Sequence, residues 1–213
     1  MMIASGKRRG RTYVRCVLGM GSGDAGCAER TAGGGGMRVL NFIGQPGAGK
    51  STLAAGVFWL LKTRHHNVEL VTEYTKDAIY EGSGFVLEDE LLVFAEKYRR
   101  IKRLSGSVEM AITDSPLMNA VFYDQSFGAE GRAFFRRVAE GFDNRYVFVR
   151  RVAPYVPHAR MGSQAEADRM ADVIRDFLVA EGIPFFEVEG DMAAPAKVVD
   201  WLDATGALEP RLV

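Results

Sequence analysis

The chain has 213 residues, 47% of them hydrophobic, and its 27 basic and 27 acidic side chains give a formal net charge of zero. This length and composition favour one α/β domain with a substantial core, and a neutral chain has no overall field that would recruit nucleic acid or an anionic membrane. No apolar run approaches the roughly 20 residues that cross a bilayer, so we expect a cytoplasmic protein without membrane contact.

Residues 1–36 differ in composition from the rest of the chain. They hold ten of the 24 glycines, both cysteines, and six basic residues against two acidic ones. Arg15 interrupts the apolar stretch Tyr13–Met20, so no secretion signal is indicated. The four glycines before Met37 favour either an over-extended reading frame that truly starts at Met37 or a disordered leader. A basic arm that contacts DNA is the third interpretation, and we expect residues 37–213 to form the domain.

The run Val39–Ile43 predicts a buried strand, and a glycine-rich loop follows it. The loop matches the phosphate-binding pattern G-x-x-x-x-G-K-[ST], in which glycines let backbone N–H groups approach a triphosphate. We expect Lys50 to reach the β- and γ-phosphates of ATP and Ser51 to bind Mg²⁺. The predicted nucleotide-binding residues are Gly44, Gln45, Pro46, Gly47, Ala48, Gly49, Lys50, Ser51 and Thr52.

A dinucleotide-binding turn is the main alternative for this loop. Glu73 lies about 20 residues further on, where such a fold keeps an acid for the ribose. Thr52, however, stands where that turn needs a third glycine or alanine. The Lys50-Ser51 pair therefore favours a nucleoside triphosphate.

The next predicted elements end in acidic residues. An amphipathic helix over 50–64 precedes a strand over 68–73, and a second helix over 87–104 precedes a strand over 108–114. Glu73 is expected near the phosphates if its strand neighbours the first one, with a helix cap or a surface acid as the alternative. Asp114 is expected to hold the Mg²⁺ shell, as in a Walker B position. Ser115 is expected to cap a helix that starts at Pro116.

Two basic segments allow more than one interpretation. The end of the second helix carries Lys97, Arg99, Arg100, Lys102 and Arg103, which we expect to form a solvated face, with phosphate or nucleic-acid contact as the alternative. After a helix over 131–141 and a strand over 146–149, residues 150–163 are predicted to form a lid. Its arginines, Arg150, Arg151 and Arg160, would close over a transferring phosphoryl group, and a plain surface loop is the alternative.

The last predicted elements are a helix around 170–178, a strand over 183–187 and a closing helix over 195–204. With them, the chain from Met37 on resembles the small P-loop kinases, specifically the phage-type nucleotide kinase or ATPase proteins. The resemblance rests on GQPGAGKST at 44–52, VELVTEYTKD at 68–77, TDSPL at 113–117 and RRVAPYVPHAR at 150–160. It implies a P-loop NTPase fold, with a parallel five-stranded sheet in the order 2-3-1-4-5 and helices on both faces.

The chain is also distantly similar to deoxynucleoside kinases. Those enzymes keep a glutamate after the second strand as a base, which corresponds to Glu73, and an acid-Arg-Ser signature after the third strand. Here that signature is Asp114-Ser115-Pro116 and lacks the arginine.

These patterns predict an ATP- and Mg²⁺-dependent phosphotransferase. We expect Lys50, Glu73, Asp114, Arg151 and Arg160 to act in catalysis, with Glu73 taking the acceptor proton and Ser51 and Asp114 binding the metal. The expected acceptor is a nucleoside, a nucleotide or a modified base in phage DNA. The alternative is an ATPase switch coupled to a protein or nucleic-acid partner. The oligomeric state is left open.

Overall fold

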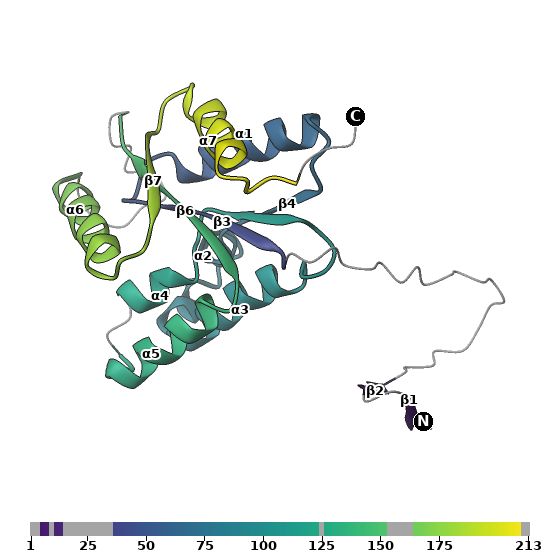
Figure 1. Ribbon diagram of the computed structural model, residues 1–213. Helices are drawn as coiled ribbons and strands as arrows, with labels where there is room; N and C mark the ends of the chain where they lie inside the picture. The colour runs from purple at the N-terminus through teal and green to yellow at the C-terminus, as the bar shows by residue number, and fades with distance from the viewer. Residues whose placement is uncertain (1–4, 9–10, 15–35, 124–125, 153–163, 210–213) are drawn as a thin grey trace. The chain divides into compact units, whose positions relative to one another are not determined.

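The computed structural model describes residues 5–8, 11–14, 36–123, 126–152 and 164–209 (Figure 1). The chain divides into two units, Met1–Gly33 and Gly34–Val213. In the first unit, β1 (Ser5–Arg8) and β2 (Arg11–Val14) pair antiparallel. Both cysteines lie outside the described residues. The expectation that 1–36 is a leader or lies before the true start stays a prediction.

The second unit is built on a five-stranded sheet in the order β4-β5-β3-β6-β7. The strands are β3 (Arg38–Ile43), β4 (Val68–Val71), β5 (Met110–Thr113), β6 (Asp143–Arg150) and β7 (Phe185–Glu189). Every pairing is parallel, and β3 lies at the centre between β5 and β6. This arrangement confirms the predicted 2-3-1-4-5 order and the P-loop NTPase fold.

Helices cover both faces of the sheet because successive residues of β3 point to opposite sides. Leu40 and Phe42 pack with α1 (Lys50–Thr63) and α7 (Ala194–Ala204). On the other side, Val39 packs with α3 (Glu90–Lys102), α4 (Met118–Tyr123) and α5 (Gly128–Ala139), and Ile43 packs with α6 (Gln164–Ala180). Figure 1 shows α1 and α7 together, across the sheet from α3, α4 and α5.

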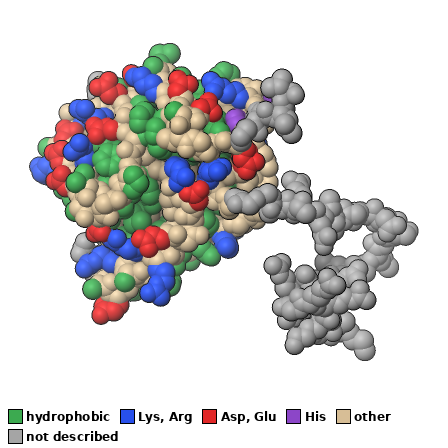
Figure 2. Space-filling view, viewed as in Figure 1, with side chains coloured by type: hydrophobic (Ala, Val, Ile, Leu, Met, Phe, Trp, Pro, Cys, Tyr) green, Lys and Arg blue, Asp and Glu red, His purple; other side chains and the backbone are tan. Residues whose placement is uncertain are grey.

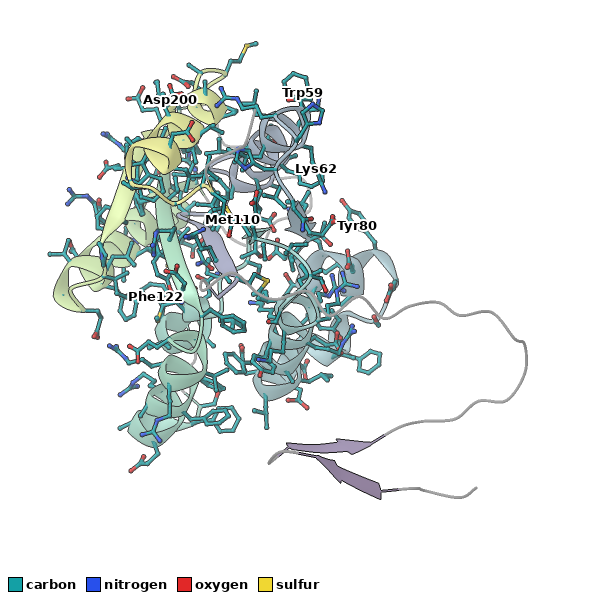
Figure 3. All side chains as sticks on the ribbon, turned by 45° about the vertical axis from the view of Figure 1, so that its right-hand side comes forward. Trp59, Lys62, Tyr80, Met110, Phe122 and Asp200 are labelled. Carbon is teal, nitrogen blue, oxygen red and sulfur yellow. The ribbon has the colours of Figure 1, made fainter. Side chains whose placement is uncertain are left out.

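The interior is apolar and the surface is mixed. Met110 is fully buried between the layers, whereas Trp59 and Tyr80 lie at the periphery (Figure 3). Basic and acidic side chains are interspersed over the face seen in Figure 2. Among the residues that the structure describes, no helix is long and apolar enough to cross a membrane.

Several boundaries differ from the predicted ones. The connection after β4 contains α2 (Tyr74–Tyr80) and the 3₁₀ helix η1 (Gly84–Glu88), neither of which was expected. Helix α3 begins at Glu90 rather than 87 because the side chain of Asp89 caps it, accepting a hydrogen bond from the Leu92 N–H at 2.9 Å. Helix α4 begins at Met118, two residues after Pro116. Strand β6 is longer than expected, and helices α5 and α6 begin earlier.

Candidate nucleotide-binding site

The candidate site lies where the five parallel strands end. In an open α/β sheet, ligands bind beyond the carboxyl ends of the strands. The glycine-rich loop follows β3, Glu73 follows β4, Asp114 follows β5 and Arg151 follows β6. Because the strands are parallel and in register, the structure brings the predicted residues of four connections to one edge of the sheet.

The glycine-rich loop has the backbone conformation that its sequence predicts. Gly44, Gly47 and Gly49 have φ values of 147°, 80° and 89°, a region that side-chain-bearing residues avoid. Gly49 is the residue before α1, which begins at Lys50. The positive end of α1 is therefore directed at the loop, which suits an anion.

The polar side chains of the loop and the first helical turn differ in their contacts and in their exposure. Lys50 Nζ donates hydrogen bonds to the carbonyl oxygens of Gly44 and Gln45, at 2.9 and 3.0 Å, so its ammonium lies over the loop. Ser51 and Thr52 are exposed in the first turn of α1. Gln45 is buried, and among the described residues its Oε1 has no hydrogen-bond partner.

The backbone of two neighbouring strands buttresses the loop. A Cβ added to Gly44 would lie 2.6 Å from the carbonyl oxygen of Val149, and one added to Gly190 would lie 2.4 Å from that of Ala48. Real Cβ atoms do not approach oxygen this closely. The residue after β7 must therefore be glycine for the loop to keep its place.

Glu73 and Asp114 meet around a lysine. Lys76 Nζ lies 3.5 Å from Glu73 Oε2 and 3.8 Å from Asp114 Oδ2, and it donates a hydrogen bond of 2.6 Å to Ser51 Oγ. Glu73 Oε1 accepts a 2.6 Å hydrogen bond from Thr75 Oγ1. Glu73 also stands at the N-cap position of α2, but its side chain makes no cap hydrogen bond, so the helix-cap alternative holds for its position only.

Asp114 has the features of a metal-binding carboxylate. Its side chain is 8% exposed, and Oδ1 is buried without a hydrogen-bond partner among the described residues. Burying a carboxylate oxygen without a partner is costly, and a cation would remove that cost. Within the same residues, no three His, Cys, Asp or Glu side chains cluster as a metal site. A Mg²⁺ ion would therefore be held by Asp114, Ser51 and phosphate oxygens, and the residues present fit that arrangement.

The basic end of α3 is only partly a solvated face. Arg99, Lys102 and Arg103 are exposed as expected, but Lys97 is half-buried. Burial lowers the pKa of the Lys97 ammonium, while the negative charges of Glu73, Glu90 and Asp114 oppose that shift. Lys97 is therefore a partly buried residue, and the solvated-face interpretation does not hold for it.

Arg100 of the same helix anchors α2. Its Nη1 donates a 2.6 Å hydrogen bond to Asp77 Oδ2, and its guanidinium lies 5.2 Å from the centre of the Tyr74 ring. The side chain is 18% exposed. These contacts hold the short helix that carries Lys76. Arg100 therefore also differs from the expected solvated face.

The arginines after β6 have different surroundings. Arg150 is exposed and lies 3.6 Å from Glu187 Oε1. The side chain of Arg151 is 7% exposed and forms an ion pair with Asp168 of α6. The lid role of these arginines stays a prediction. Both line a cavity of about 540 Å³ that Gln45 also borders. Arg160 and the rest of the predicted lid from 153 to 163 lie outside the described residues.

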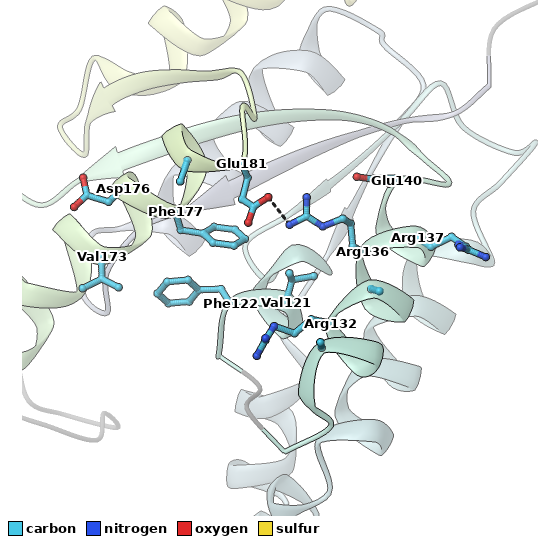
Figure 4. A pocket seen from close by; sticks show the side chains of 13 residues that line it. Val121, Phe122, Arg132, Arg136, Arg137, Glu140, Val173, Asp176, Phe177 and Glu181 are labelled. Atoms are coloured by element: carbon cyan, nitrogen blue, oxygen red, sulfur yellow. Dashed lines mark ion pairs between the residues drawn. The ribbon is translucent and has the colours of Figure 1, made fainter.

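A larger cavity of about 950 Å³ lies between α4, α5 and α6 (Figure 4). Phe122 and Phe177 pack edge to face in it, with ring centres 5.4 Å apart, and Arg136 pairs with Glu181 at 2.6 Å. None of its lining residues belongs to the glycine-rich loop or carries a predicted role. This cavity is therefore separate from the candidate site.

Lys76 and Gly190 belong to the site but were not predicted from the sequence, and Lys97 was expected on a solvated face. Lys76 is three residues from Glu73, and this spacing on a helix could have placed both side chains together had α2 been recognised. Lys97 lies among four other basic residues, so the sequence did not distinguish it from them. For Gly190, no local pattern signals the contact with Ala48.

Comparisons with known proteins place these residues in context. A family model described as an AAA domain matches residues 39–194, which include the loop, Glu73, Asp114 and Gly190. The APS kinase CysC of Mycobacterium tuberculosis is 18% identical, with a TM-score of 0.44, over 78% of this chain and 97% of that chain. A protein named APE1195 is 18% identical, with a TM-score of 0.46, over 79% of this chain and 95% of that chain. No curated protein matches the sequence.

Proposed function

The chain belongs to the AAA domain family, and from that premise we propose that it is an ATP-dependent phosphotransferase. The observation that carries the proposal is the meeting of Ser51, Glu73 and Asp114 around one ammonium group beside the glycine-rich loop. A loop for phosphates, a metal-type carboxylate and a second, more exposed carboxylate are what transfer to a hydroxyl group requires.

The loop would bind the triphosphate of ATP. Backbone N–H groups of 44–51 and the start of α1 offer positive partial charge to the phosphates, and Lys50 adds a full charge. Lys50 Nζ donates to two loop carbonyls, and phosphate oxygens would replace these carbonyls as its partners. Arg150 and Gln45, which border the same cavity, extend the proposed nucleotide site.

The two acids would have different roles. Asp114 is 8% exposed and supports binding of Mg²⁺ together with Ser51, whereas Glu73 is 29% exposed and can be reached by an acceptor. Held by Asp114 and Ser51, Mg²⁺ would supply positive charge that neutralises the charge developing during transfer. Glu73 would accept the proton of the acceptor hydroxyl, a contribution of typically 10²- to 10⁴-fold.

The proposed acceptor is a nucleoside, a nucleotide or a modified base in DNA. Arg151 and Arg160 are proposed to neutralise charge during transfer, with Arg151 positioned through its pair with Asp168. The competing proposal, an ATPase switch, keeps every assignment except that of Glu73, which would orient a water molecule instead. The exposure of Glu73 is compatible with both reactions.

Paired substitutions test this assignment. Asp114→Asn should lower acceptor phosphorylation and background ATP hydrolysis together, and raised Mg²⁺ or Mn²⁺ should partly restore both. Glu73→Gln should cut transfer to a hydroxyl acceptor while ATP affinity stays near wild type, because an amide keeps the size but cannot take the proton. An Asp114→Asn protein with normal metal dependence would overturn the role of Asp114.

The Glu73 variant also separates acceptor classes. A monophosphate oxygen is already ionised and needs no base, so Glu73→Gln should cost little with a nucleoside monophosphate as acceptor. If hydrolysis alone falls and no acceptor is phosphorylated by the wild-type protein, the ATPase switch replaces the kinase.

A further inference from the structure

Lys76 holds the oxygens that the proposed metal site would use. Its ammonium donates to Ser51 Oγ at 2.6 Å and lies 3.8 Å from Asp114 Oδ2, the two side chains assigned to Mg²⁺. We propose that Lys76 is an internal counter-cation that keeps divalent metal out of the nucleotide-free site and must move before the metal ion enters. This inference rests on the proposed function, because the metal roles of Ser51 and Asp114 belong to it.

The ammonium and a metal ion compete for the same lone pairs. Mg²⁺ is a hard cation that takes oxygen ligands at about 2.0–2.1 Å, and hydroxyl and carboxylate oxygens are its usual partners. Ser51 Oγ already accepts from Lys76, and two cations about 4 Å apart would repel each other strongly. The metal ion and the bound Lys76 ammonium therefore exclude each other.

Lys76 satisfies the site only in part. It contacts one oxygen of Asp114, and that contact is longer than a hydrogen bond. The other oxygen, Oδ1, is buried without a hydrogen-bond partner within the part of the chain that the structure describes. The aspartate side chain as a whole is only 8% exposed. The carboxylate thus retains binding capacity that a lysine at this distance does not use and a divalent ion would.

Lys76 is free to leave without unfolding its helix. Its side chain is 49% exposed, and lysine has a flexible four-carbon stem. The backbone of α2 is held independently by the Arg100–Asp77 hydrogen bond and by the packing of Arg100 on Tyr74. Only the lysine side chain needs to rotate, so the exchange is a local event.

The nucleotide would drive the exchange. A triphosphate in the loop brings several negative charges next to Ser51, which raises the affinity for a divalent ion and offers the displaced ammonium new partners. The nucleotide-free protein should therefore bind divalent metal weakly, and metal binding should be coupled to nucleotide binding.

The test measures Mn²⁺ binding to the full chain without nucleotide, by the electron paramagnetic resonance signal of free Mn²⁺. Lys76→Met, which keeps the length of the side chain and removes the charge, should bind Mn²⁺ about tenfold more tightly than wild type. Lys76→Arg keeps a cation and should stay within about twofold of wild type. Lys62→Met, in the last turn of α1 over the Phe58 ring, is the control for net charge and should also stay unchanged.

A double variant locates the metal. In Lys76→Met combined with Asp114→Asn, the gain in Mn²⁺ affinity should disappear, because the freed site needs the carboxylate. Equal Mn²⁺ affinity in wild type and Lys76→Met would overturn the proposal, and so would a gain that persists without Asp114. The assay contains no ATP and no acceptor, so a protein that shows the gain but transfers no phosphoryl group would refute the kinase function alone.

Discussion

Replacing Gly190 by alanine should displace the phosphate-binding loop, although Gly190 is far from the loop in the sequence. Gly190 follows β7, and its N–H donates a 2.8 Å hydrogen bond to the Arg150 carbonyl. A Cβ at this position would lie 2.4 Å from the Ala48 oxygen, 3.2 Å from the Arg150 oxygen and 3.3 Å from Val149 Cγ1. Two of these three atoms are backbone, so no side-chain rotation relieves the contact.

The size of the effect follows from the shift that is needed. Ordinary contact begins near 3.4 Å, so the Ala48 oxygen and the new methyl group must separate by about 1 Å. Overpacking of this kind costs roughly 1 to 3 kcal/mol. For a domain of this size, that corresponds to a decrease of about 2 to 12 °C in Tm. Because Ala48 belongs to the loop, ATP affinity should fall as well, by about tenfold or more.

The assay pairs thermal unfolding with ATP titration on the same samples. Gly84→Ala is the matched control, because a Cβ there meets nothing within 4 Å and its φ is not in the left-handed region. The control should keep the Tm and the ATP affinity of wild type. A Gly190→Ala protein with unchanged Tm and unchanged ATP affinity would refute the claim that β7 buttresses the loop.

Three further predictions concern single side chains. Burial raises the pKa of the Tyr146 phenol, with a smaller contribution from Glu140, so the unfolded chain loses this proton near pH 10 while the folded protein keeps it. Stability should fall above about pH 10, by up to ~1.4 kcal/mol per pH unit, and urea unfolding of Tyr146→Phe should lack this component. Lys97→Met should lower kcat/KM for phosphotransfer about tenfold, because it removes a partly buried positive charge that interacts electrostatically with Glu73 and Asp114, whereas Lys102→Met, at an exposed position of the same helix, should stay within about twofold. Lys50→Ala should keep the wild-type Tm but lose ATP binding in titration calorimetry, and full activity in that folded protein would contradict its role.

The sequence predicted the sheet and the loop because both depend on local signals. Val39–Ile43 is a buried apolar run, and the glycine pattern after it requires positive φ at set positions. The strand order came from the resemblance to P-loop kinases, and the acids at 73 and 114 were identified because each ends an apolar strand. The strands, the loop and the two acids need no knowledge of contacts between distant residues, whereas the strand order rests on the family resemblance.

Tertiary contacts account for what the sequence did not reveal. Helix α2 buries only Ala78, so its sequence has no amphipathic pattern to detect. The contact between Lys76 and Ser51 joins residues 25 positions apart, and the contact of Gly190 with Ala48 depends on the packing of β7 beside β6. Lysine is usually a surface residue, and only the packing around α3 leaves Lys97 partly buried.

Transfer of the terminal phosphoryl group of labelled ATP is the most direct test of the central claim. Wild type and Glu73→Gln would be incubated with Mg²⁺ and a panel of nucleosides, nucleoside monophosphates and oligonucleotides with modified bases, and the label would be followed into acceptor and inorganic phosphate. The proposed mechanism predicts that label enters one acceptor class in wild type. With a hydroxyl acceptor, Glu73→Gln should transfer label about 10²- to 10⁴-fold more slowly than wild type. Label found only in inorganic phosphate with every acceptor would contradict it.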